Sequence, residues 1–219
     1  MIRVAAAAAA VALLAGCGSG GRGRATLWVT RDEGRTVLLV RSVPAGETAI
    51  QALERSAKIT TRYGGRYVQS VDGLSGSLSS RHDWFYFVNG IEADRGAAEY
   101  RLHPGDVEWW DYRDWGRVGQ SVPVVVGAFP EPFLHGYDGK VRRAVVVGTS
   151  ASARTFARLL HGSVVTRVPP GANVLRLVGG RPRFTARLLP DGAVEFTFAG
   201  NARRLALVPS MYRYRYSVP

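Results

Sequence analysis

Three sets of side chains have the types and spacing that chemistry would need, and Ser150 belongs to the first. The segment 148–152, Gly-Thr-Ser-Ala-Ser, follows an apolar run and precedes a helical pattern, which is the context of a nucleophile elbow. The closing glycine of that motif is absent, and Ser150 fits a helix cap better. His135 and His161 could act as bases, but nothing in the sequence ties either of them to Ser150. We therefore expect no catalytic residues and no enzyme activity.

The other two sets contain potential metal ligands. Carboxylates stand at positions 106, 108, 111 and 114, close enough in sequence for paired-carboxylate hydrolysis or Ca²⁺ binding. Because such residues also suit a solvated strand edge, we favour that interpretation. His82 and Asp83 are adjacent but lack the further spaced partners that a metal site needs. Phosphate-loop, dinucleotide-binding and zincin motifs are also missing, so we expect no metal and no cofactor.

The N-terminal segment of the chain has the pattern of an export signal. Arg3 precedes an apolar run at 4–15. At about 1.5 Å per residue this run is too short to span a bilayer core of about 30 Å, and it fits a signal peptide at 1–16. Cys17 follows directly and is the only cysteine, so no disulfide can form within the chain.

The segment 14–17, Leu-Ala-Gly-Cys, resembles the lipobox of bacterial lipoproteins. The resemblance implies that Cys17 carries a diacylglyceryl group with acyl chains such as palmitate and becomes the mature N-terminus. Residues 17–24 would then be a lipidated, flexible tether. Since two or three acyl chains make a stable anchor, we expect the protein on the outer face of the bacterial cytoplasmic membrane. The alternative is an ordinary secretory signal with an incidental cysteine.

The net charge of +12 comes almost entirely from arginine. A basic chain raises the question of nucleic-acid binding. The arginines occur in both halves, in basic runs no longer than two residues, which argues against that partner. For an exported protein, anionic lipid or wall polymer is the expected counter-charge. We therefore expect a membrane partner and no nucleic-acid partner.

Residues 25–116 have the pattern of a first α+β domain. Two β-branched runs within 26–43 indicate a hairpin. Thr48 and Gln51 have capping-box spacing at the start of a helix that we expect to continue until Gly64. Short strands follow, and the strongest of them, 84–88, ends in an Asn-Gly pair typical of a tight turn. A hairpin, one helix and a mixed sheet form the arrangement of β-grasp-like folds.

The segment 84–90, Trp-Phe-Tyr-Phe-Val-Asn-Gly, resembles the core of a bacterial domain family of unassigned function. That family is related to the C-terminal domain of transcobalamin and intrinsic factor. The flanking segments 71–73 and 102–109 fit the same family, and the resemblance covers about 25–116. It implies a ligand-binding or uptake-accessory module for a vitamin or corrinoid-like ligand. The vertebrate relatives hold the corrinoid mainly through a separate helical domain that this chain lacks, so cobalamin contacts cannot be transferred residue by residue.

Alternation along the strands assigns their side chains to two faces. We expect the phenylalanines at 85 and 87 to pack beneath the helix, and the amphipathic residues to form an aromatic platform on the other face. Rings with polar tips suit flat or sugar-like ligands. The candidate ligand-binding residues are Trp84, Tyr86, Glu108, Trp110 and Tyr112, with Tyr63 and Tyr67 as further candidates. Alternatively, these rings only cover the sheet. An open pocket at this face would favour binding, and burial against 121–219 would favour packing.

Residues 121–219 have the pattern of a second small α+β domain and show no family resemblance. We expect a helix from Ser150 to about His161, a hairpin at 183–199 and a strand at 205–208. The tail at 212–216 alternates tyrosine and arginine, which is typical of an edge strand or of a segment that adheres to anionic surfaces.

Three functions fit this sequence. The first is an extracytoplasmic lipoprotein that binds a small ligand for a transporter. The second is a structural or adhesive surface module that contacts cell-wall polymer or a membrane-protein partner. The third, which has the least support, is an extracellular enzyme that uses the second domain.

Overall fold

The computed structural model describes residues 23–219, and the predicted α+β class is confirmed. The signal peptide predicted at 1–16, Cys17 and most of the tether lie outside the described residues. The first strand begins at Arg24, so the last residue of the expected tether already belongs to the fold. Within the described part, no helix has both the length and the apolar character needed to cross a membrane.

The first sheet is mixed and has five strands. They are β1 (Arg24–Arg31), β2 (Thr36–Pro44), β6 (His82–Val88), β7 (Ile91–Glu92) and β8 (Val107–Asp114). Their order is β2-β1-β8-β6-β7. The β1–β8 pair at the centre is parallel, and the β1–β2 hairpin at one edge is antiparallel. This is the mixed sheet that a β-grasp-like unit requires.

Helix α1 (Ala49–Ser56) begins at the predicted capping box. The Thr48 hydroxyl accepts a hydrogen bond from the Gln51 backbone N–H at 3.3 Å, and the Gln51 side chain accepts one from the Thr48 N–H at 2.9 Å. Ile50 and Leu53 are buried against the first sheet. The predicted start and inward face of this helix are therefore confirmed.

The end of the helix differs from the prediction. Residues 59–62 form strand β3 (Ile59–Arg62), which pairs with β4 (Tyr67–Val71) and β5 (Leu74–Ser75) in a three-stranded sheet. The run Ile-Thr-Thr is β-branched and favours a strand. The Asp72 carboxylate also accepts a hydrogen bond from the Lys58 N–H at 2.9 Å. The expectation that the helix continues to Gly64 is therefore wrong.

The second five-stranded sheet lies in the C-terminal half. Its strands are β9 (Ala144–Val147), β10 (Ser163–Val164), β11 (Asn173–Val178), β12 (Arg183–Leu188) and β13 (Val194–Ala199), in the order β10-β9-β11-β13-β12. The predicted hairpin of β12 and β13 is confirmed. The other pairs in this sheet are parallel.

Helices α4 (Ala151–Leu159) and α5 (Ala202–Leu207) pack on one face of the second sheet. Ser150 is the N-cap residue of α4 as expected, although its hydroxyl makes no capping hydrogen bond. The strand expected at 205–208 is wrong. Asn201 accepts a hydrogen bond from the Arg204 N–H at 3.0 Å and starts a helix there instead.

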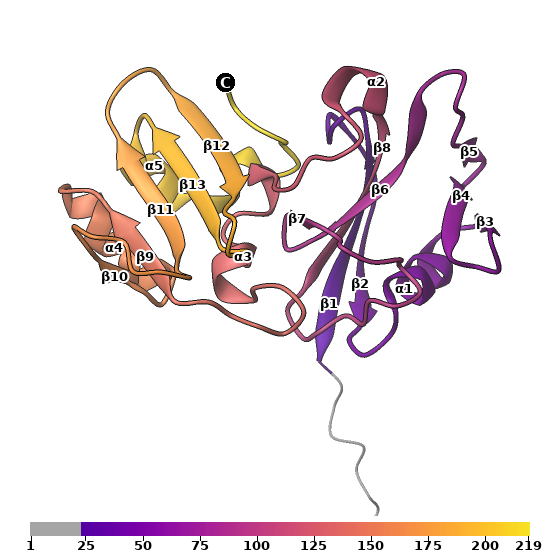
Figure 1. The fold of residues 1–219 in the computed structure, drawn as a ribbon, viewed down its shortest axis with the longest axis horizontal. Coiled ribbons are helices and arrows are strands. Elements are labelled where there is room, and N and C mark those ends of the chain that lie inside the picture. The colour runs from indigo at the N-terminus through magenta and orange to yellow at the C-terminus, as the bar shows by residue number, and fades with distance from the viewer. Residues whose placement is uncertain (1–22) are drawn as a thin grey trace, which may run out of the picture.

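The segment between the sheets contains α2 (Trp115–Val118), the 3₁₀ turn η1 (Val126–Ala128) and α3 (Glu131–Leu134). In Figure 1, α1 and β3–β5 lie on one side of the first sheet, and the second sheet lies on the other.

The C-terminal tail returns to the first sheet after the 3₁₀ turn η2 (Pro209–Tyr212). Tyr214 packs edge-on against Trp28, with ring centroids 4.8 Å apart, and Tyr216 packs against Phe87 at 5.5 Å. The Tyr216 hydroxyl donates to Asp111 at 2.9 Å. Over 212–216 the tail is thus neither an edge strand nor a free adhesive segment, because Tyr214 and Tyr216 cover the first sheet and Tyr212 packs against Phe184 and Phe198 of the second sheet.

Candidate functional site

The two faces of the aromatic strand β6 are reversed relative to the prediction. Trp84 and Tyr86 pack in the same core as α1, whereas Phe87 packs against the segment after α2 and the C-terminal tail. Phe85 is half-buried and stacks beneath the Arg113 guanidinium, 3.6 Å from the ring centroid. The expectation that the phenylalanine pair lies under the helix is therefore wrong. The second half and the tail cover the opposite face, so that face also requires large apolar side chains.

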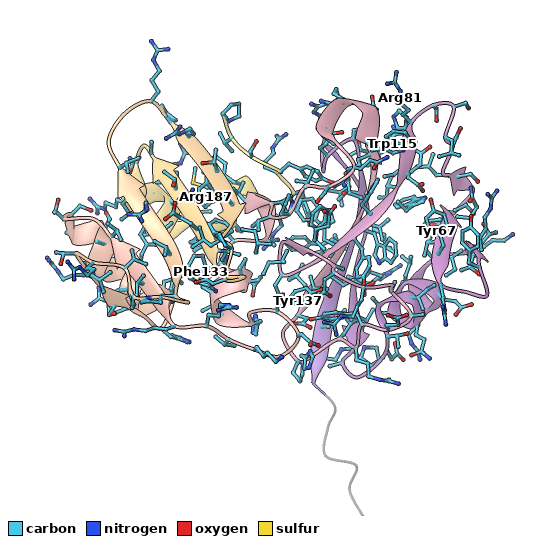
Figure 2. The ribbon with its side chains drawn as sticks, in the orientation of Figure 1. Tyr67, Arg81, Trp115, Phe133, Tyr137 and Arg187 are labelled. Atoms are coloured by element: carbon cyan, nitrogen blue, oxygen red, sulfur yellow. The ribbon has the colours of Figure 1, made fainter. Side chains whose placement is uncertain are left out.

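The predicted aromatic residues nevertheless line an open pocket. The pocket has a volume of about 250 Å³, and Trp84, Tyr86 and Trp110 form part of its wall. The segment 93–97 closes one side, and Arg66 and Tyr67 on the β4 side form another. Tyr67 is labelled in Figure 2. None of the residues lining this pocket comes from 121–219, so the face is not buried against the second half.

Hydrogen bonds hold the rings of this pocket in place. The Trp84 indole N–H donates to the Leu74 carbonyl at 2.9 Å, and the Tyr86 hydroxyl donates to the Arg95 carbonyl at 2.6 Å. Burial raises the pKa of Tyr86, so its hydroxyl stays protonated and remains a donor. Since these polar tips are already bonded, the rings offer a ligand mainly their faces and edges.

Contacts between the aromatic rings also hold them in place. The Tyr86 and Trp110 rings are nearly parallel, with an interplanar angle of 21° and centroids 4.9 Å apart. Trp84 and Tyr112 lie at 5.3 Å in a tilted arrangement. Trp84, Tyr86 and Trp110 are each less than a tenth exposed, so all three also belong to the core. The site is therefore a shallow opening in a rigid aromatic core rather than the exposed platform that we expected.

Tyr67 is better placed than Tyr63. The Tyr67 hydroxyl donates to the Asp83 carboxylate, and burial and that contact both raise the pKa of Tyr67. Tyr63 is 78% exposed and contacts only the edge of the Tyr67 ring among the aromatic side chains of the described residues. Arg66 lines the pocket as well, and sequence reasoning missed it because a single arginine in a turn carries no pattern.

Glu108 is buried in the core and does not line the pocket. The Trp110 indole N–H donates to one of its carboxyl oxygens at 2.5 Å, and the other oxygen has no partner among the described residues. Burial raises the pKa of Glu108 well above its usual value. A neutral carboxyl beneath α1 is a structural group rather than a ligand contact.

The neighbouring carboxylates do not converge on a shared site. Asp106 accepts hydrogen bonds from Asn89 at 2.7 Å and from the His103 N–H at 2.8 Å. Asp111 lies on the other face of β8 and binds Tyr216, and Asp114 caps α2. Because positions 106, 108 and 111 are fully buried, the expectation of a solvated strand edge is wrong. Each carboxylate instead holds a different turn or segment in place.

The histidines that the sequence offers for catalysis or metal binding each contact a different local partner. His135 pairs with Glu131 within the turn around α3, at 2.7 Å, and His82 stacks on the Tyr112 ring. Over residues 23–219, no group of three or more His, Cys, Asp or Glu side chains could hold a metal ion.

Comparison with known proteins adds a partial match. Residues 46–114 match the model of a domain of unknown function, DUF4430, which includes α1 and the strands from β3 to β8. No curated protein matches the chain. Among solved structures, 16 chains match.

Two of these structures differ in how much of the matched protein the alignment covers. A candidate metal-binding protein from Ruminococcus gnavus ATCC 29149 is 15% identical with a TM-score of 0.34, and the alignment covers 41% of this chain and 95% of that one. Haptocorrin in complex with Cbi is 16% identical with a TM-score of 0.33, over 42% of this chain. The alignment spans only 26% of haptocorrin.

Proposed function

We propose that the first sheet and α1 form a small-ligand-binding module, and that its ligand enters the pocket lined by Trp84, Tyr86 and Trp110. The observation that supports this proposal is the opening itself. Three ordered aromatic rings border a hollow that the rest of residues 23–219 leaves uncovered. Ligand sites typically combine such apolar walls with a few polar groups, and here Arg66, Tyr67 and Glu92 supply them.

The size of the pocket limits the ligand. Its volume of about 250 Å³ is near the lower end of drug-sized sites, which begin at about 300 Å³. We infer that the pocket takes one flat ring or sugar-like unit, or the edge of a larger vitamin. A corrinoid ring is too large to be enclosed, so a corrinoid would insert only a side group and lie across the mouth.

We further propose that the module works as an extracytoplasmic lipoprotein anchored through Cys17 on the outer face of the bacterial cytoplasmic membrane. The sequence of residues 1–17 supports this location. A binding module held there could deliver its ligand to a membrane transporter, which is the partner that we propose.

A titration tests the proposed ligand class. The full chain in non-ionic detergent would be titrated with cobalamin, related corrinoids and single-ring vitamins while tryptophan fluorescence is followed. Trp84 and Trp110 line the pocket, so a bound ring should quench or shift the emission in a saturable way. No saturable change with any corrinoid would remove the corrinoid ligand, and none with any of the compounds would contradict the module's proposed role.

The second candidate function is an adhesive module, and the distribution of charge favours it. Residues 121–219 contain 14 Arg and Lys against 4 Asp and Glu, a net charge of +10 out of the chain's +12. Such a concentration of positive charge on one half attracts anionic polymers or surfaces.

A further inference from the structure

The open face of the second sheet carries a compact group of arginine and threonine side chains. Helices α4 and α5 and the larger apolar cluster lie on the opposite face, and a smaller buried cluster around Val145 and Val174 covers part of this face at β9 and β11. On the open face, Arg176 of β11 lies across from Thr197 of β13, which lies across from Thr185 of β12. One step along the strands, Arg187 of β12 lies across from Glu195 of β13. Arg187 is labelled in Figure 2.

Glu195 holds the two arginines beside each other. The Arg176 Nε–H donates to one of its carboxylate oxygens at 2.7 Å, and Arg187 donates to the other through Nε at 2.9 Å and Nη2 at 2.6 Å. Burial alone would raise the pKa of Glu195, but these hydrogen bonds lower it below its usual value. The carboxylate thus stays charged and fixes both guanidinium groups.

Most donors of the two arginines remain free. Within residues 23–219, neither terminal nitrogen of Arg176 has a hydrogen-bond partner, and Arg187 has Nη1 free. The Arg187 side chain is 68% exposed and that of Arg176 is 37% exposed. The hydroxyls of Thr185 and Thr197 also make no hydrogen bond to the described residues. The two guanidinium groups and the two threonine hydroxyls therefore present unused hydrogen-bond donors to solvent, next to the buried Glu195 carboxylate.

We propose that this cluster, Arg176, Arg187, Thr185 and Thr197 around Glu195, binds phosphate groups of an extended anionic polymer. Guanidinium groups match the geometry of phosphate oxygens, and fixing them in advance reduces the entropy lost on binding. Arg183 lies on the same face of β12, four residues from Arg187, which corresponds to about 13 Å along the strand. A second phosphate of the same polymer reaches Arg183, whereas a single small anion does not reach both.

The polar character of the face favours a polymer over a lipid bilayer. Threonine hydroxyls lie between Arg176 and the β12 arginines, and Val178, the exposed apolar side chain beside them, presents little surface that could insert into a membrane. This site shares no residue with the aromatic pocket and does not depend on a ligand binding there.

Calorimetric titration of the full chain with inorganic polyphosphate tests the proposal. The double variant Arg176→Gln/Arg187→Gln should bind at least about tenfold more weakly than the unmodified chain. The matched control is Arg203→Gln/Arg204→Gln on α5, which removes the same charge from the opposite face and should change affinity less than about twofold. Equal losses in the two double variants would show diffuse attraction and overturn the proposal.

Two further measurements guard against misfolding and against other partners. Thr197→Val leaves the ion pairs intact and should still weaken binding several-fold, whereas Thr155→Val on α4 should not. Unchanged affinity in Thr197→Val would contradict the arrangement proposed here. The absence of binding to polyphosphate would overturn the proposal. If phosphatidylglycerol vesicles then bound Arg176→Gln/Arg187→Gln more weakly than the unmodified chain, the face would belong to lipid, because the proposed Cys17 anchor is the same in both proteins.

Discussion

Asn89 explains at the level of one residue why the Asn-Gly pair follows the aromatic strand. Its side-chain amide donates to Asp106 at 2.7 Å and to the Gly136 carbonyl at 2.9 Å, and its oxygen accepts from the Val107 N–H at 2.8 Å. It is fully buried and has a φ of 51°, a conformation that asparagine tolerates better than most residues. One side chain thus joins the turn after β6, the start of β8 and the loop after α3.

We predict that Asn89→Ala lowers the free energy of unfolding by about 2–5 kcal/mol, because three buried groups lose their partner. Asn201→Ala, which removes the cap of α5 at an exposed position, should cost only about 1 kcal/mol. Urea denaturation of both variants measures the difference. Similar small losses in the two would contradict the linking role of Asn89.

Glu108 gives a prediction about pH. Its pKa is raised in the folded state, so the stability that it contributes is present below its ordinary pKa of 4.5 and is lost as pH rises through the folded value. Glu108→Gln stays neutral and should therefore be about 1–3 kcal/mol more stable than the unmodified chain at pH 8. At pH 4 the two should be nearly equal.

The control for this comparison is Glu99→Gln, since Glu99 is exposed. Its stability should follow that of the unmodified chain at both pH values. Thermal unfolding at pH 4 and pH 8 measures all three proteins, and a Glu108→Gln variant that is less stable at pH 8 would show that the buried carboxylate has a charged role.

At the level of elements, short-range sequence patterns predict caps and turns correctly, but they do not predict which layers pack against each other. The capping box at Thr48 and the turn at Asn89–Gly90 are short-range patterns, and the structure contains both. The faces of β6 were assigned wrongly because both faces of this strand are covered, so apolar and amphipathic rings are equally suitable on either side. Alternation can separate two faces, but only the arrangement of α1 and the tail decides which one packs under the helix.

The candidate site shows the same limit. The rings at 84, 86 and 110 could be named from the sequence because they form a dense aromatic pattern. The contribution of Arg66 depends on where the three-stranded sheet lies, and that of 93–97 on the path of the chain after β7; no local pattern carries that information. Glu108 shares a face with Trp110, which makes it an equal candidate in the sequence, but it lies two residues earlier, near the start of β8, and does not line the pocket.

The contact between the C-terminal tail and the turn η1 gives a prediction at the level of elements. A Cβ on Gly127 would lie 2.6 Å from the Arg215 backbone nitrogen, so this close approach requires glycine. Gly127→Ala should displace the tail and lower the free energy of unfolding by about 1–3 kcal/mol through overpacking. Gly179→Ala, where the Cβ would meet no atom within 4 Å, is the matched control.

Displacement of the tail can be followed directly. Tyr214 and Tyr216 shield Trp28 and Trp109, so their loss should increase proteolysis at the C-terminus and shift tryptophan emission to longer wavelength in Gly127→Ala alone. If Gly127→Ala and Gly179→Ala behaved alike, the tail would not be held by this contact.

For the whole molecule, the chain combines three separate features. They are an N-terminus with the pattern of a lipoprotein signal, an aromatic pocket in the first half and a strongly basic second half. In the proposed account, the anchor determines where the protein works, and the two halves offer different surfaces to a small ligand and to an anionic polymer.

The anchor itself is testable. Cys17→Ser should move the protein from the membrane fraction of the producing bacterium to the soluble extracytoplasmic fraction and abolish incorporation of labelled palmitate, because the thiol is the acylation site. Ser19→Ala, two residues beyond, should change neither. Membrane retention and labelling that persist in Cys17→Ser would contradict the proposed lipoprotein.

The central claim is that the α1 side of the first sheet binds a ligand, and two adjacent tryptophans test it most directly. Trp109 and Trp110 lie on opposite faces of β8, and each indole N–H donates one buried hydrogen bond. Both Trp→Phe variants therefore remove the same groups at similar structural cost. For any ligand that binds the unmodified chain, Trp110→Phe should weaken affinity by about tenfold or more, and Trp109→Phe by less than about twofold. Equal losses, or a larger loss in Trp109→Phe, would contradict the assignment of this pocket.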